Sequence, residues 1–147
     1  MDSNVLIIDD DVFCSTILNE SFTKVGYTNI SIFNRTDEFL KYLRSSDVVL
    51  PKVLIMDYHM PFLNGFQLLA YLKKHPAYAN IKVIIYSGSA NENEKRIAIK
   101  AGAFDFVEKK YNQAKLLAFT NEVIQLAEND IYHFESDVKK SEMFSLS

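Results

Sequence analysis

The chain lacks several features that would point to particular classes of protein. Cys14 is its only cysteine, which excludes an internal disulfide and a cysteine-rich zinc site and is typical of a reducing compartment. The four glycines form no phosphate loop of the Walker or dinucleotide-binding type. No apolar run is long enough to cross a bilayer and the N-terminus lacks a signal peptide, so we expect a cytoplasmic protein without a membrane partner.

Charge and histidine content exclude further classes. The net charge is only -3 and the basic residues form no patch, so we expect no direct binding to nucleic acid. His59, His75 and His133 are too widely scattered to predict a histidine metal site. A hydrophobic content of 48% with 24% charged residues in 147 residues is typical of one ordinary globular domain, without repeats or an interdomain linker.

Short apolar runs alternate with segments of helical periodicity. The predicted strands are Val5–Ile8, Ile30–Phe33, Val53–Met56, Val83–Tyr86 and Phe104–Val107. The predicted helices run from Phe13 to Gly26, from an N-cap at Thr36, from Asn64-Gly65 to Pro76, from near Asn91 to Gly102, and from Gln113, with Asn112 as cap, to about Ala127. This pattern predicts an α/β, three-layer, doubly wound (βα)5 fold of the flavodoxin type, with a five-stranded parallel sheet.

The organising stretch is Val53–Met56 followed by Asp57. Four consecutive aliphatic residues predict a strand buried on both faces, so Asp57 lies at its carboxyl end, where open α/β folds place their chemistry. A second aliphatic strand, Val5–Ile8, is followed by Asp9 and Asp10. If the strand order is 2-1-3-4-5, these two strands are neighbours and the three carboxylates meet.

Two more polar residues end predicted strands at the same edge, namely Ser87 and Lys109. Three carboxylates in one cleft raise one another's pKa unless cations join them, and a divalent ion with the Lys109 ammonium would balance their formal charge. An oxygen-only ligand set favours Mg²⁺. Such a site would let Asp57 attack phosphorus and form an acyl phosphate.

Each of these residues also has an ordinary interpretation. The acids after the first strand can cap the first helix, and Asp11 in particular fits a cap. Asp57 and Ser87 can be turn residues, and Lys109 can be a solvated charge. Their joint placement at the ends of four strands is what favours a common site.

These segments together resemble the receiver domain of bacterial response regulators. The matching motifs are Val5-Leu6-Ile7-Ile8-Asp9-Asp10, Val53-Leu54-Ile55-Met56-Asp57-Tyr58-His59-Met60-Pro61 with Gly65, Val83-Ile84-Ile85-Tyr86-Ser87-Gly88, and Phe106-Val107-Glu108-Lys109. The resemblance implies a receiver domain over residues 4–128, followed by a tail over 129–147 without a separate effector domain. It also implies a phosphoacceptor in a two-component or phosphorelay system and not an enzyme.

The resemblance assigns roles to the site residues. It implies that Asp57 takes a phosphoryl group from a histidine kinase or a histidine phosphotransfer protein. It implies Mg²⁺ held by Asp10, Asp57 and the backbone carbonyl of His59, with Asp9 acting mainly through water.

The same resemblance assigns the switch and the output surface. Ser87, in the segment Ser87-Gly88, would hydrogen-bond the phosphoryl oxygen and Lys109 would pair with it, while Phe106 matches the aromatic residue that changes rotamer on activation. Movement of Ser87 would open space for Phe106, and because this ring has no hydroxyl, packing alone would decide its position. The fourth helix, fifth strand and fifth helix would form the face that binds a downstream target protein.

One departure from the family concerns the residue after Lys109. The family usually has a proline there in a cis peptide, but this chain has Lys110. A cis bond without proline costs about 3 to 4 kcal/mol, so we predict a trans Lys109–Lys110 bond and an altered loop.

Two other functions fit parts of the pattern. Asp9-Asp10-Asp11-Val12 after a strand also resembles the Asp-x-Asp motif of haloacid-dehalogenase-type phosphatases, with Asp9 as nucleophile, although the short chain lacks their cap module and further acidic pair. A pseudo-receiver that binds a partner but never accepts phosphate is the other alternative.

Overall fold

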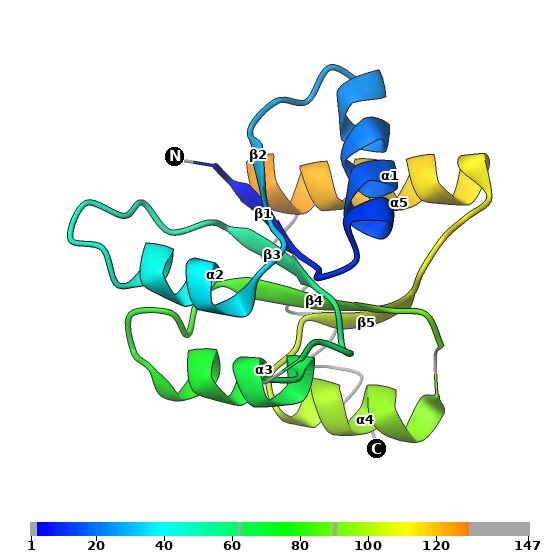
Figure 1. The fold of residues 1–147 in the computed structure, drawn as a ribbon. Helices are drawn as coiled ribbons and strands as arrows, with labels where there is room; N and C mark the ends of the chain where they lie inside the picture. Colours follow the sequence, from blue (N-terminus) through cyan, green and yellow to red (C-terminus); the bar gives the residue numbers. More distant parts are fainter. Residues whose placement is uncertain (1–2, 62, 90, 130–147) are drawn as a thin grey trace.

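Five strands alternate with five helices in the computed structural model, which describes residues 3–61, 63–89 and 91–129 (Figure 1). The elements are β1 (Val5–Ile8), α1 (Val12–Lys24), β2 (Ile30–Phe33), α2 (Thr36–Leu43), β3 (Val53–Met56), α3 (Gly65–Lys74), β4 (Lys82–Ser87), α4 (Glu92–Lys100), β5 (Asp105–Glu108) and α5 (Gln113–Glu128). None of the helices in these ranges has the length and apolar character needed to cross a bilayer. The predicted tail, from residue 130 onward, lies outside the described residues.

The strands form one sheet in the order β2-β1-β3-β4-β5, and every neighbouring pair is parallel. This confirms the predicted fold class and strand order. β1 and β3 lie side by side in the middle, and all eight of their residues are buried. Continuous aliphatic strands suit this position because side chains on both faces meet a helical layer.

Helices cover both faces of the sheet and create two apolar cores (Figure 1). On one face α2, α3 and α4 pack against alternate strand residues such as Leu54 and Met56. On the other face α1 and α5 pack against the intervening residues, such as Val53 and Ile55. Because both faces of the sheet are closely packed, the residues that follow the strands have fixed positions at the carboxyl edge of the sheet.

Most helix boundaries follow the predicted signals. Gly26 and Gly102 follow the C-cap residues of α1 and α4 and have positive φ angles of 79° and 110°, a conformation that glycine adopts without strain. Asn64 caps α3 in a reciprocal capping box with Gln67. Asn112 caps α5, as predicted.

Boundaries of α2, β4 and β5 differ from the prediction. Thr36, the predicted cap of α2, is its first helical residue, and Arg35 occupies the cap position while its guanidinium binds Asp37 at 2.9 Å. β4 is longer than predicted and includes Ser87 as its last residue. β5 begins one residue later, at Asp105, so that Lys109 directly follows the strand.

Candidate functional site

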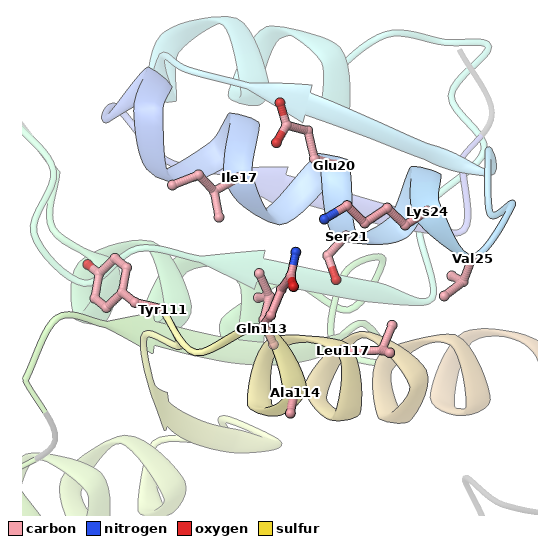
Figure 2. A pocket seen from close by; sticks show the side chains of 10 residues that line it. Ile17, Glu20, Ser21, Lys24, Val25, Tyr111, Gln113, Ala114 and Leu117 are labelled. Carbon is pink, nitrogen blue, oxygen red and sulfur yellow. The ribbon is translucent and has the colours of Figure 1, made fainter.

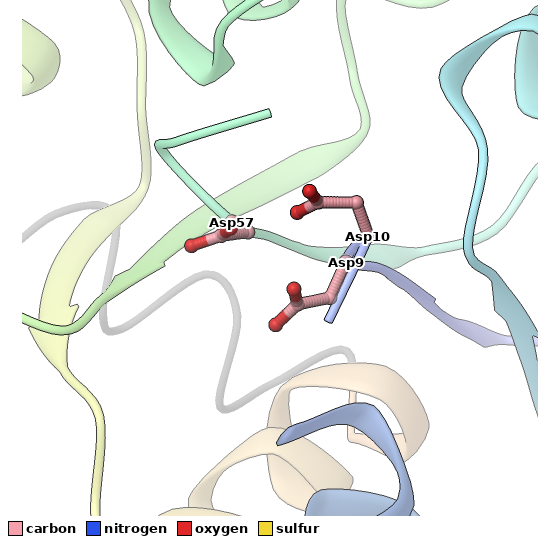
Figure 3. A group of neighbouring side chains, drawn as sticks. All are labelled: Asp9, Asp10 and Asp57. Atoms are coloured by element: carbon pink, nitrogen blue, oxygen red, sulfur yellow. The ribbon is translucent and has the colours of Figure 1, made fainter. Parts of the chain in front are cut away.

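Three carboxylates meet at the carboxyl edge of the sheet. Asp9 and Asp10 follow β1, Asp57 follows β3, and the pairing of Ile8 with Met56 brings the two strand ends level. One carboxylate oxygen of each aspartate lies within 4.8 Å of the others (Figure 3). Asp9 and Asp57 are buried and Asp10 is exposed, so the cluster opens to solvent on the Asp10 side.

The backbone around Asp9 and Asp57 is firmly held. The Asp57 amide donates to the Ile8 carbonyl at 2.9 Å, which continues the β1–β3 ladder up to the site. Asp9 Oδ1 accepts from the Asp11 amide at 2.9 Å, and the Asn34 side-chain amide donates to the Asp9 carbonyl at 2.8 Å. These bonds fix both carboxylates before any ligand arrives, which reduces the cost of binding one.

Asp11 caps a helix, as expected. Its Oδ1 accepts from the amides of Phe13 and Cys14, at 3.0 and 3.2 Å, and so begins α1. The Asp9-x-Asp11 pair is therefore divided between the carboxylate cluster and a cap. This arrangement gives no support to the phosphatase hypothesis, which needs both acids at one reacting centre.

Lys109 joins the two buried carboxylates. Its Nζ lies 3.1 Å from Asp9 Oδ2 and 3.3 Å from Asp57 Oδ1, and all three side chains are largely buried. Burial opposes the charge of the ammonium, but the facing carboxylates outweigh this effect and raise the Lys109 pKa. Lys109 and Asp9 are 100 residues apart in the sequence, and the fold brings them into contact.

Burial and mutual repulsion raise the pKa values of the carboxylates. Burial, followed by the charge of Asp9, raises the pKa of Asp57 to about 6 despite the nearby Lys109 ammonium. Burial also raises the pKa of Asp9, while its hydrogen bond from Asp11 and the Lys109 charge partly offset this. The single ammonium of Lys109 therefore does not balance the negative charge of the three carboxylates.

The cluster fits a hard divalent cation. Its donors are carboxylate oxygens alone, they lie close enough to share an ion, and one of them is open to solvent so that bound waters can be kept. These are the properties of a Mg²⁺ site, and a softer metal such as Zn²⁺ is usually bound with nitrogen or sulfur ligands. The carboxylates, a cation and Lys109 would together reach charge balance.

The loop after Asp57 folds back against the site. The Gly65 amide donates to the Tyr58 carbonyl at 2.8 Å, which closes the segment that carries His59. A Cβ on Gly65 would lie 2.7 Å from the Asp57 carbonyl oxygen and 2.9 Å from Tyr58 Cα. Only glycine allows α3 to begin this close to the strand end, so Gly65 supports the loop that presents the His59 carbonyl.

Ser87 is the last residue of β4, Gly88 follows it, and Phe106 lies in β5. Ser87 is fully buried, and its Oγ accepts from the Ser89 amide at 3.4 Å. A Cβ on the exposed Gly88 would meet no described atom within 4 Å, so packing does not require glycine there. Phe106 is buried, with its ring centroid 6.1 Å from that of Tyr58. The ring therefore already occupies an inward position in this structure.

The loop after β5 has the predicted trans Lys109–Lys110 bond. The Lys109 amide donates to the Ser87 carbonyl at 2.6 Å, and the Lys110 amide donates to the Tyr86 hydroxyl at 2.8 Å. The sequence pattern did not indicate the contribution of Tyr86, or that of Asn34 beside Asp9. Only their positions at the carboxyl ends of strands could have indicated these roles.

A groove lies next to this loop, on the face covered by α1 and α5. It has a volume of about 630 Å³ and is lined by residues of both helices together with Tyr111 of the β5–α5 loop (Figure 2). Tyr111 interacts with Cys14 in the first turn of α1. The exposed side chains of Val12 and Phe13 lie in the same turn, so apolar surface borders the carboxylate cluster.

Comparisons with known proteins agree with this geometry. The family model described as the response regulator receiver domain matches residues 5–121. The chain is 29% identical over 123 residues to the chemotaxis protein CheY of Thermotoga maritima, covering 84% of this chain and 98% of that protein. It is 30% identical over 121 residues to the DNA-binding transcriptional regulator NtrC of Proteus hauseri, covering 82% of this chain but only 24% of that longer protein.

A solved structure also has the same fold. The signal receiver domain of a DNA-binding response regulator (merR) from Colwellia psychrerythraea 34H has a TM-score of 0.68 and 25% sequence identity, covering 84% of this chain and 99% of that one. The segment matched by the family model includes all three carboxylates, Ser87 and Lys109.

Proposed function

Because this chain belongs to the response regulator receiver family, whose members are phosphoacceptors of two-component signalling, we propose that Asp57 is the residue that accepts the phosphoryl group. The observation that carries this proposal is the Lys109 ammonium between Asp9 and Asp57, in a cluster whose carboxylate oxygens lie within 4.8 Å. Asp57 occupies the end of the central strand β3, with Asp9 and Asp10 on the neighbouring strand β1. The proposed receiver domain spans residues 4–128.

The chemistry begins with the Asp57 carboxylate. One of its oxygens attacks the phosphorus of a phosphohistidine, the P–O bond forms, the P–N bond breaks, and the electron pair returns to the imidazole nitrogen. The attacking oxygen must be unprotonated, and at pH 7.5 most Asp57 carboxyls are ionised because their pKa is about 6. Lys109 faces the same carboxylate and can pair with a phosphoryl oxygen after transfer.

Asp10, Asp57 and the His59 carbonyl would hold Mg²⁺, with Asp9 acting mainly through water. Bound Mg²⁺ would neutralise negative charge on the phosphoryl oxygens during transfer. The protein's own contribution is to hold the carboxylates at one edge, as the backbone bonds to Asp9 and Asp57 indicate.

Phosphorylation would switch the domain through charge. The single charge of Asp57 becomes about -2 with added acceptor oxygens, which draws the Ser87 hydroxyl and Lys109 toward the phosphoryl group. Ser87 ends β4 and Lys109 follows β5, so the displacement reaches α4, β5 and α5. We assign the output face to these elements, with Phe106 as the residue whose packing follows the change.

The phosphodonor is a histidine kinase or a histidine phosphotransfer protein, and the output is a downstream target protein that binds the α4-β5-α5 face. The chain acts on no substrate other than its own Asp57, which it can phosphorylate from a donor and dephosphorylate by hydrolysis. The exposed apolar residues of the first turn of α1 lie next to the site, on the face of the sheet that α1 shares with α5.

Mass spectrometry after incubation with acetyl phosphate and Mg²⁺ tests the proposal. We expect one phosphoryl group on Asp57, and neither Asp57→Asn nor EDTA-treated protein should gain it. Asp9→Asn should retain Asp57 as the modified residue at a reduced rate. Modification of Asp9 would support the phosphatase hypothesis, and failure of both acetyl phosphate and beryllium fluoride to change the protein with Mg²⁺ present would support a pseudo-receiver.

A further inference from the structure

Two successive amides attach the β5–α5 loop to strand β4. The Lys109 amide binds the carbonyl of Ser87, and the Lys110 amide binds the side-chain hydroxyl of Tyr86, at 2.6 and 2.8 Å. The first bond extends the ladder between β4 and β5. The second uses a side chain, and it fixes the peptide unit that joins Lys109 to the next residue.

The Tyr86 hydroxyl is a rigid acceptor. Tyr86 is 5% exposed, and its ring stacks on that of Phe119 in α5, with centroids 5.0 Å apart and planes at 4°. Both neighbours of the ring, β4 and α5, belong to the core on the α1–α5 face. The packed ring therefore fixes the position of the hydroxyl, and the hydrogen bond to this hydroxyl fixes the backbone of the loop at Lys110.

This loop controls the aim of Lys109. The ammonium must lie between Asp9 and Asp57, where its distances are 3.1 and 3.3 Å, and a shift of the backbone at 109–110 would move it. A proline at position 110 could not make the observed bond, since it has no amide hydrogen. The lysine that stands there supplies the donor that Tyr86 accepts.

We propose that Tyr86 is a positioning residue for phosphoryl transfer, whose hydroxyl holds the Lys110 amide and thereby aims the Lys109 ammonium at the two buried carboxylates. This inference rests on the proposed function of Asp57. It concerns how the chain orients Lys109, because the Tyr86 hydroxyl acts through the Lys110 amide.

Tyr86→Phe tests the proposal because it removes the acceptor and keeps the ring stacked on Phe119. We expect the rate of phosphorylation by acetyl phosphate to fall by roughly 5- to 10-fold, since small misplacements of a catalytic group cost that much or more. In a Lys109→Gln background the same change should have no further effect, because the ammonium to be aimed is gone. Lys110→Ala keeps the amide and should leave the rate unchanged.

Tyr78→Phe is the matched control. It also removes a buried tyrosine hydroxyl with a hydrogen bond to the backbone, here to the Leu43 carbonyl at 3.1 Å, but on the other face of the sheet. We expect it to lower the unfolding midpoint about as much as Tyr86→Phe without lowering the phosphorylation rate. Equal losses of rate in Tyr78→Phe and Tyr86→Phe would overturn the positioning role, as would equal losses from Tyr86→Phe with and without Lys109.

A second readout separates this inference from the proposed function. Urea unfolding of the native chain, Tyr86→Phe, Lys109→Gln and the double variant needs no phosphodonor, and a positioning role requires non-additive changes in the unfolding midpoint. If the changes are non-additive but the native chain is not phosphorylated, the proposed function of Asp57 is contradicted and the positioning role of Tyr86 is not. Additive changes would overturn the positioning role even if Asp57 is phosphorylated.

Discussion

At the scale of single residues, the site stores unfavourable electrostatic energy that a ligand can release. Asp9 and Asp57 are buried side by side with one ammonium between them, and burial with repulsion raises the pKa of Asp57 to about 6. The folded protein therefore binds more protons at Asp57 than the unfolded chain does between pH 3.8 and about 6. The contribution of Asp57 to stability falls as the pH rises through this window, so above it the charge destabilises the metal-free fold.

Asp57→Asn should consequently stabilise the metal-free protein at pH 7.5. We expect a gain of about 1 to 2 kcal/mol in the free energy of unfolding, because the neutral amide avoids the cost of burying the Asp57 charge, which Lys109 offsets only in part. Urea denaturation in EDTA measures this gain, which should shrink toward zero at pH 4. A less stable variant at pH 7.5 would show that pairing with Lys109 outweighs the burial of the Asp57 charge.

At the scale of elements, the start of α3 is tied to the end of β3. A Cβ on Gly65 would come within 2.7 Å of the Asp57 carbonyl oxygen, a backbone atom that cannot move alone. Gly65→Ala should therefore displace the loop carrying His59 and lower the free energy of unfolding by about 1 to 3 kcal/mol, as overpacking in a core does. Calorimetry measures the stability, and titration with Mg²⁺ should show weaker binding.

Gly88→Ala is the matched control for stability. A Cβ at this position would meet no described atom within 4 Å, so we expect an unfolding midpoint close to that of the native chain. If Gly65→Ala is equally well tolerated, the close approach of α3 to β3 does not constrain the loop. If both variants lose equal stability, crowding at Gly65 is not the cause of the loss.

The elements also show what a sequence can predict and what it cannot. Asp9, Asp57 and Lys109 could be predicted to meet because parallel strands align their carboxyl ends, whatever the separation along the chain. Thr36 could not be distinguished from a helical residue, because a cap is defined by backbone angles, and these are extended at Arg35, with φ at -138° and ψ at 133°.

Tyr86 illustrates a different limit. Its apolar neighbours on β4 predict a core residue, which it is, and its hydroxyl finds the Lys110 amide only because the strand ends where the β5–α5 loop passes. Sequence patterns predict which face a side chain occupies, but a contact between two loop or strand-end atoms depends on the exact path of the backbone. The trans bond at Lys110 was predictable from the cost of a cis peptide, whereas its hydrogen-bond partner was not.

At the scale of the whole molecule, the proposed output surface and the surface around the carboxylates must do different work. The proposed output elements α4 and α5 lie against opposite faces of the sheet, and α1 with its exposed apolar first turn lies beside the carboxylates (Figure 1). A small phosphodonor needs access only to Asp57. A protein donor must bring a phosphohistidine to the same atom, and to do so it must cover the residues that surround the opening.

Phe13→Ser separates these two routes. Phe13 is 69% exposed in the first turn of α1, so its removal should barely affect folding or phosphorylation by acetyl phosphate. Transfer from a phosphorylated histidine phosphotransfer protein that acts on the native chain should slow by roughly 10-fold, the loss typical of a buried aromatic contact at an interface. Stopped-flow or gel assays of the two donors measure the rates.

The control for this comparison is Val49→Ser, because Val49 is 53% exposed in the loop before β3 and so lies at the opposite edge of the sheet. It removes an exposed apolar side chain without approaching the carboxylates, and both donors should act on it at the native rate. An equal loss with both donors in Phe13→Ser would mean that the residue shapes the site itself. An unchanged rate with the protein donor would mean that the donor approaches Asp57 over another part of the carboxyl edge, where the β3–α3 and β4–α4 loops border the same cluster.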